Sequence, residues 1–328
     1  MSLRFEIRSK TSYTRRFMDT WFPDLPRQAR KLNRAITALP TVCPADYDEQ
    51  YLFMLVGTAI DYRLRAYFAD DIHRSAIVKA GLELCELPSE VSLPVTDAGR
   101  GWVVNAWNRW RGPGGVADNF VKAFELFAAQ RSLRAGRLPP DDEERLARFC
   151  FIIANLDCVG RSALSAPTFL YQFGSRDTDA MLAAVAQPVV DDLVRLSESF
   201  AERYKATIAR ATSVFLGQSL EGSDDVGGAD FDLVVDGTLY DFKTTIVSKI
   251  ETSFLRQVIG YWLLDYGDAF GMRVAAIDLT RQGHTERFDI ANDLLRVTDP
   301  DELRRMFRKG LRSKLVPPIK PGLRLVVP

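Results

Sequence analysis

The sequence predicts an α/β protein whose N-terminal region is largely helical and whose C-terminal half contains a β-sheet. Three observations lead to this expectation. Apolar residues recur at helical spacing up to about residue 210, alternation typical of strands follows, and Asp236-Gly237 marks a tight hairpin turn. At 328 residues, with 47% hydrophobic and 26% charged residues, the chain can bury a large core. We expect a helical region over residues 1–184 and a second domain over residues 185–328.

Helices in the N-terminal region are predicted from segments whose apolar residues fall on one helix face. Pro188 is expected to break the last of them, because proline lacks the amide proton that a helix interior requires. The predicted helices cover residues 48–68, 118–136, 141–157 and 177–211.

Strands are predicted after residue 210, where β-branched and aromatic residues alternate with polar ones. One amphipathic helix, residues 252–267, interrupts them and gives the order helix, three strands, helix, two strands. The predicted strands cover residues 213–220, 231–236, 238–244, 273–279 and 285–290.

The hairpin at Asp236-Gly237 is expected to bring several charged side chains onto one face of the sheet. Counting outward from the turn pairs Val235 with Thr238, Val234 with Leu239, Leu233 with Tyr240, Asp232 with Asp241, and Asp230 with Lys243. The opposite face would then carry Phe231, Leu233, Val235, Tyr240 and Phe242. Two facing aspartates repel each other, and a divalent cation between them would offset that repulsion.

The same segment resembles a known family of nucleases. Asp232, an Asp-x-Lys motif at Asp241 and Lys243, and a following helix with Gln257 and Tyr261 match the PD-(D/E)XK nuclease superfamily, in particular its RecB-like branch. The resemblance covers roughly residues 185–290. It implies a PD-(D/E)XK nuclease core, a mixed central sheet flanked by helices, in the C-terminal half.

The resemblance also implies hydrolysis of DNA phosphodiester bonds with Mg²⁺ or Mn²⁺. Asp232, Asp241 and the backbone carbonyl of Phe242 would hold the metal, which is a donor set that magnesium accepts. Lys243 would orient the attacking water and stabilise the developing charge. Gln257 and Tyr261 lie four residues apart on one helix face and would position the substrate and the other catalytic groups, although Tyr261 could instead be helix core.

Two acidic candidates lie outside this segment. The family uses an acidic residue on the helix before the first strand, where Asp191, Asp192, Glu198 and Glu202 are available and Glu198 fits best by position. The segment at residues 56–65 resembles a Gly-x-x-x-His element of the family, with Asp61 in place of the histidine as a further metal ligand. For both Glu198 and Asp61 the alternative is an ordinary surface charge.

Charge is balanced overall but concentrated at the two ends. Residues 1–34 carry nine Arg and Lys against three acids, and residues 301–328 carry eight against two. If both ends fold to one side they would form a phosphate-attracting surface, and ordinary solvated helix faces are the alternative. Tryptophans and arginines in residues 100–115 could similarly contact nucleic acid or belong to the core.

The cysteines, the histidines and the apolar runs argue against several classes of protein. The four cysteines are not spaced for a zinc or iron-sulfur site, and two histidines far apart leave little for histidine-based catalysis. No apolar run is long enough for a membrane span and residues 1–17 lack a signal-peptide core, so we expect a soluble cytoplasmic protein.

The function expected is that of a nuclease in DNA repair or in defence against foreign DNA, with a possible protein partner for targeting. The first alternative is a catalytically silent relative that binds nucleic acid or a protein. The second is a protein in which these charges form only a structural network.

Overall fold

The computed structural model describes residues 2–47, 50–86, 116–162, 170, 178–295 and 299–313. The chain divides into two compact units, here called the sheet unit (Met1–Val42 with Arg210–Pro328) and the helical unit (Cys43–Ala209). This division differs from the expected boundary at residue 184 in two ways: residues 1–42 belong to the sheet unit with the C-terminal elements, and residues 185–209 belong to the helical unit. The segment at residues 100–115, for which nucleic-acid contact or a core position was considered, lies outside the described residues.

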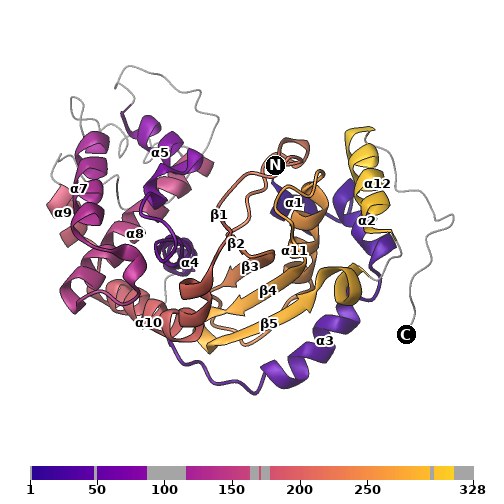
Figure 1. Cartoon of the computed structure of the whole chain (residues 1–328), viewed down its shortest axis with the longest axis horizontal. Coiled ribbons are helices and arrows are strands. Elements are labelled where there is room, and N and C mark those ends of the chain that lie inside the picture. Colours follow the sequence, from indigo (N-terminus) through magenta and orange to yellow (C-terminus); the bar gives the residue numbers. More distant parts are fainter. Residues whose placement is uncertain are drawn as a thin grey trace. The chain divides into compact units, whose positions relative to one another are not determined.

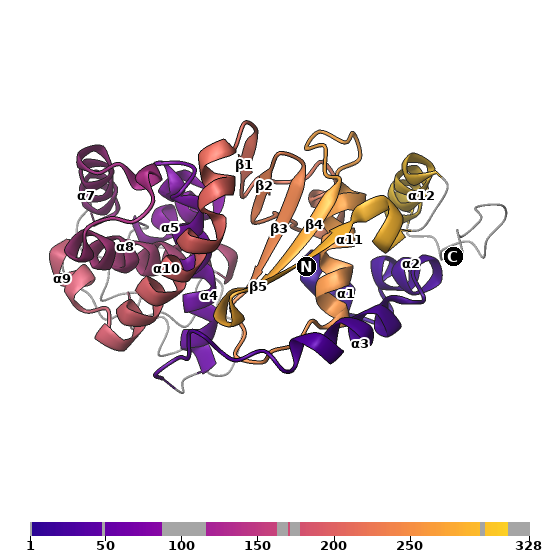
Figure 2. The same cartoon turned by 60° about the horizontal axis from the view of Figure 1, so that its bottom comes forward.

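A mixed five-stranded sheet forms the centre of the sheet unit (Figures 1 and 2). Its strands follow chain order, β3 and β4 are parallel, and the other neighbours are antiparallel. Parallel neighbours need a crossover connection, which here contains helix α11 (Thr252–Leu264). The predicted α/β fold with helices flanking a sheet is therefore confirmed. The strands are β1 (Val214–Leu216), β2 (Leu233–Val235), β3 (Thr238–Lys243), β4 (Val274–Leu279) and β5 (His284–Asp289).

The hairpin between β2 and β3 turns at the predicted residues. Asp236 and Gly237 have φ angles of 46° and 74°, as a type I′ turn requires at both central positions. The three predicted pairs nearest the turn, from Val235–Thr238 to Leu233–Tyr240, are confirmed.

The predicted continuation of this ladder beyond Leu233 is wrong. β2 begins at Leu233, and Asp232 lies in a bend before it. Asp230 forms a bridge with Ser219 instead of pairing with Lys243. Because the bend interrupts the alternation, Phe231 joins the core cluster that contains Val234 and does not share the face of Leu233.

Four helices pack around α11 in the sheet unit. They are α1 (Leu3–Arg8), α2 (Tyr13–Trp21), α3 (Leu25–Ile36) and α12 (Pro300–Ser313). The ring of Phe17 in α2 meets Phe307 of α12 edge to face at 5.0 Å, so the two ends of the sequence share one hydrophobic core. This unit also contains short turns at Asp224–Val226 and Thr280–Gln282 and a π-helix at Ile290–Leu295.

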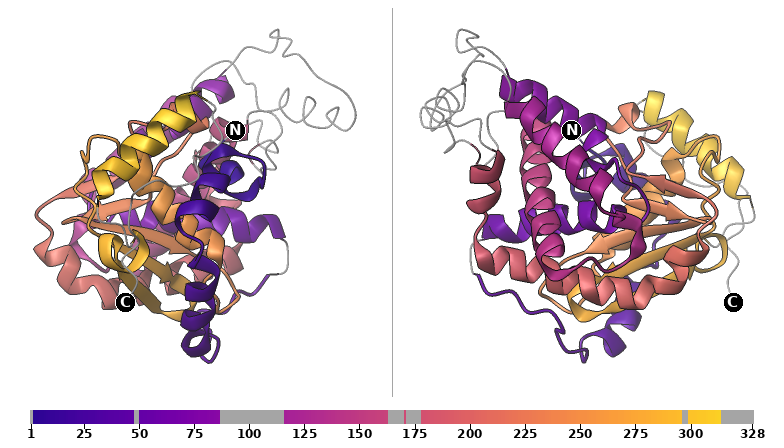
Figure 3. Two further views of the ribbon diagram at one scale, coloured as in Figure 1. Left: turned by 90° about the vertical axis from the view of Figure 1, so that its right-hand side faces the viewer. Right: turned by 60° about the vertical axis from the view of Figure 1, so that its left-hand side comes forward.

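The described part of the helical unit contains six α-helices, whose packing is visible in Figure 3. α5 and α8 approach closely at Gly81 and Gly160. A Cβ atom on Gly81 would lie 2.1 Å from the carbonyl oxygen of Leu156. The expected break near Pro188 is confirmed as the gap between α9 and α10. The helices are α4 (Gln50–Arg65), α5 (Ala76–Glu86), α7 (Val116–Gln130), α8 (Pro140–Ser162), α9 (Thr178–Ala183) and α10 (Gln187–Arg210), with short turns at Ile72–Arg74 and Leu133–Ala135.

Among the described residues, no helix is both long enough and apolar enough to cross a membrane.

Candidate active site

The end of β3 and one face of α11 bring four of the predicted site residues together. The ammonium Nζ of Lys243 lies 2.7 Å from Oδ2 of Asp241 and donates a hydrogen bond of 3.0 Å to Oε1 of Gln257. Nε2 of Gln257 in turn donates to the hydroxyl of Tyr261 at 2.7 Å. Asp241 and Lys243 share a strand face because they are two residues apart, and Gln257 and Tyr261 share a helix face because they are four apart.

Asp232 reaches the same site from the bend before β2. Its Oδ2 accepts a hydrogen bond of 3.0 Å from the backbone amide of Phe242, between Asp241 and Lys243. The amide and carbonyl of one strand residue point toward the same neighbouring strand. The carbonyl of Phe242 is therefore directed to the edge of β3 at which the Asp232 carboxylate lies.

Burial dominates the electrostatics of Asp241, whose residue surface is 1% exposed. Burial raises its pKa to about 6, since a carboxylate loses its hydration there; the Lys243 charge opposes this rise and the Asp232 charge adds to it. Burial, together with Asp232 and Asp241, also raises the pKa of Tyr261 well above its ordinary value. The Tyr261 phenol is therefore neutral at physiological pH.

The donor set suits a hard divalent cation. Within the described part of the chain, the Lys243 ammonium, 2.7 Å from Oδ2, is the only partner of the Asp241 carboxylate, and Oδ1 accepts no hydrogen bond. A buried carboxylate oxygen without a donor is costly unless a cation or further ligand satisfies it. Asp232, Asp241 and the Phe242 carbonyl supply oxygen ligands only, which is the preference of Mg²⁺.

These ligands would form a sparse metal site. Nowhere in the described residues do three or more His, Cys, Asp or Glu side chains cluster in a way that could hold a metal. An ion at Asp232 and Asp241 would complete its coordination with backbone oxygen, water and substrate, as magnesium commonly does.

The remaining two predicted site residues belong to the helical unit. Glu198 on α10 forms an ion pair with Arg137, and Asp61 on α4 forms one with Arg65 in the next helical turn. Their predicted roles as additional ligands stay predictions.

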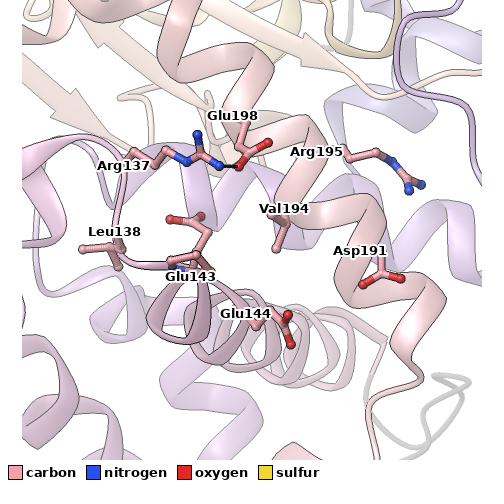
Figure 4. A pocket seen from close by; sticks show the side chains of 9 residues that line it. Arg137, Leu138, Glu143, Glu144, Asp191, Val194, Arg195 and Glu198 are labelled. Carbon is pink, nitrogen blue, oxygen red and sulfur yellow. Dashed lines mark ion pairs between the residues drawn. The ribbon is translucent and has the colours of Figure 1, made fainter.

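Glu198 also lines a cavity of about 260 Å³ between α8 and α10. Figure 4 shows Arg137 extended to Glu198, with Arg195 directed away from that pair. The lining has more carboxylates than guanidinium groups, so this cavity does not favour an anionic substrate. Its charged residues are Arg137, Glu143, Glu144, Asp191, Arg195 and Glu198.

One residue near the carboxylates, Arg4 on α1, was not predicted from the sequence. The positive charge of Arg4 lowers the pKa of Asp241, against the larger effect of burial. α1 is held there because the Leu3 amide donates to the carbonyl of Gly228 at 2.9 Å and the Leu3 side chain covers Gly260 on α11. No motif identifies Arg4, because its position depends on packing between residues more than 200 apart in sequence.

Comparison with known proteins does not extend these observations. The chain matches no protein-family model, no curated protein and no solved structure.

Proposed function

We propose that this protein is a metal-dependent nuclease that hydrolyses DNA phosphodiester bonds, with a PD-(D/E)XK-type core in its sheet unit. The observation that carries the proposal is the connected set of Asp232, Asp241 and Lys243, in which a buried carboxylate is paired with the lysine ammonium and lies near a second carboxylate. The strand order and the Asp-x-Lys spacing agree with the resemblance drawn from the sequence.

Asp232, Asp241 and the Phe242 carbonyl would hold Mg²⁺ or Mn²⁺. When bound, the ion supplies neutralisation of the phosphate charge and a more acidic water. The ammonium of Lys243, held by Gln257, orients the attacking water and stabilises negative charge on the phosphate. The neutral phenol of Tyr261 fixes the Gln257 amide, so that Gln257 presents its oxygen to Lys243.

The test is cleavage of linear and circular DNA, single- and double-stranded, by the purified full-length protein with Mg²⁺, Mn²⁺ or EDTA. Asp241→Asn and Lys243→Met should each lower the cleavage rate by about 100-fold or more, since each removes a group acting on the reacting atoms. Asp278→Asn is the matched control, because Asp278 is equally buried and pairs with Phe242 from β4, on the opposite face of the sheet from Asp241. Lys309→Met on the surface of α12 controls for the loss of a lysine.

Each outcome has a distinct meaning. Metal-dependent cutting that disappears in both site variants and persists in both controls supports the proposal. Cutting that persists in Asp241→Asn would assign the activity to another site or to a contaminant. Binding of DNA without cutting by the wild type would favour the silent nucleic-acid-binding alternative.

A further inference from the structure

Helix α3 carries an exposed row of positive charges in the sheet unit. Its apolar residues Leu25, Ala29 and Ile36 are buried, while the opposite side presents cations at positions i, i+3, i+4 and i+7. This row, here called the α3 stripe, consists of Arg27, Arg30, Lys31 and Arg34.

The α3 stripe is short of counter-charges, whereas the other basic helix is not. Within the described residues, only Arg27 of the stripe has an acidic partner, Asp24 at 3.5 Å. On α12, by contrast, Arg308 pairs with Glu221 at 3.0 Å and Arg312 with Asp225 at 2.9 Å. The positive potential of the sheet unit is therefore less neutralised along α3 than along α12.

Helix α3 is hydrogen-bonded to the segment that follows β3 in the candidate active site. Oδ1 of Asn33 accepts from the Ile250 amide at 2.8 Å, and Nδ2 of Asn33 donates to the Ile250 carbonyl at 2.9 Å. Ile250 lies in the connection between Lys243 and α11, and Figure 2 shows this connection running beside α3. These two hydrogen bonds hold α3 next to the connection between β3 and α11.

Two apolar side chains project from the same connection. Ile246 and Val247 are 53% and 56% exposed. Apolar groups beside a row of cations fit a nucleic-acid strand better than a simple polyanion, because bases and sugars lie alongside the phosphates.

We propose that the α3 stripe binds the phosphates of a DNA strand and leads that strand to Lys243, with Ile246 and Val247 in contact with its bases. The stripe is about 10 Å long at 1.5 Å per helical residue, comparable to the axial distance of about 10 Å spanned by four successive phosphates of one strand. This inference rests on the proposed function for its choice of DNA, and it adds the surface that receives the substrate.

The test is fluorescence anisotropy of short labelled single- and double-stranded DNA with the full-length protein, in EDTA and over a range of salt concentrations. Arg30→Glu/Arg34→Glu should weaken binding at least tenfold and reduce the slope of log K against log salt by about 2, because two phosphate contacts are lost. The matched control is Arg305→Glu/Lys309→Glu, which makes the same charge change on exposed positions four apart on α12. This control should keep nearly the wild-type affinity.

Equal weakening in the two charge-reversal variants would overturn the proposal, because net charge alone would then set the affinity. Ile246→Ser/Val247→Ser should lower the affinity without changing the salt slope, and an unchanged affinity would remove these two residues from the interface.

Cleavage measurements keep this proposal separate from the nuclease proposal. Arg30→Glu/Arg34→Glu should raise the DNA concentration needed for half-maximal cutting, whereas Asp241→Asn should bind DNA and leave it intact. Wild-type protein that binds through α3 but never cuts would refute only the nuclease activity. Wild-type protein that cuts with no dependence on α3 would refute only the binding surface.

Discussion

The ammonium of Lys243 lies 2.7 Å from Oδ2 of Asp241, two residues earlier on the same strand. This contact neutralises part of a carboxylate that is otherwise buried and without hydrogen-bond donors. A cation at Asp241 would compete with the ammonium for that carboxylate and free Lys243 to act on water. Asp241 therefore has a partner in the absence of a metal, and that pairing would change if a metal ion bound there.

Asp241→Asn should stabilise the metal-free protein. Burial disfavours the charged form of Asp241, and an amide of the same shape removes that cost, so the free energy of unfolding should rise by about 1 to 3 kcal/mol at neutral pH. Urea denaturation in EDTA measures this change. Added Mn²⁺ should raise the melting temperature of the wild type and not that of the variant. A variant less stable than the wild type in EDTA would show that the Lys243 contact outweighs the desolvation of Asp241.

Gln257→Leu should lower kcat more than it raises KM. Gln257 holds the Lys243 ammonium on one side and the Tyr261 hydroxyl on the other, so its loss leaves the lysine misplaced. A misplaced catalytic group can cost about 10- to 100-fold in rate. Steady-state kinetics with linear DNA measure the effect, and Tyr261→Phe should show a smaller loss because Lys243 keeps its partner. Equal rates in Gln257→Leu and wild type would remove Gln257 from the site.

Arg4→Ala should raise KM with little change in stability. Arg4 is exposed and its charge acts on Asp241, so it is available to a phosphate at the site. Loss of one charge-assisted hydrogen bond corresponds to about tenfold in KM. Arg4→Lys should recover part of the effect, and Lys10→Ala, which removes an exposed charge in the turn after α1, should not change KM. A purely structural role for Arg4 would instead appear as a lower melting temperature with normal KM.

Asp268→Asn should lower stability at neutral pH and have little effect in acid. Hydrogen bonds from Arg273 and then Arg304 lower the pKa of Asp268 against the effect of burial. Because the folded-state pKa lies below the unfolded-state value, the carboxylate stabilises the fold above its usual pKa, and the benefit disappears as the pH falls through the folded-state pKa.

The loss from Asp268→Asn at pH 7 should be about 1 kcal/mol, since Asp268 is partly solvated. Asparagine also tolerates the φ of 53° at this position, so the substitution tests the charge and not the backbone. Urea denaturation from neutral to acidic pH measures the effect, with Asp224→Asn as an exposed control. A difference between wild type and Asp268→Asn that does not depend on pH would contradict the ion-pair explanation.

Local patterns predicted the candidate site better than the surroundings of the site. The Asp-Gly turn determines the pairing of Leu233 with Tyr240 by counting alone, and helical spacing determines that Gln257 and Tyr261 share a face. The bend at Asp232 could not be predicted, because nothing local indicates that the alternation stops there. The positions of Arg4 and Asn33 could not be predicted either, since both residues act through contacts across more than 200 residues of sequence.

The sheet unit is assembled from both ends of the sequence, and this has a consequence for how the protein folds. Phe17 cannot meet Phe307 until residue 307 has left the ribosome, whereas the helical unit needs no residue beyond Ala209. Domains generally fold as units during synthesis, and contacts distant in sequence form slowly. The apolar faces of the first three helices therefore stay uncovered until the C-terminal elements are made, and refolding of the sheet unit should be the slower of the two steps.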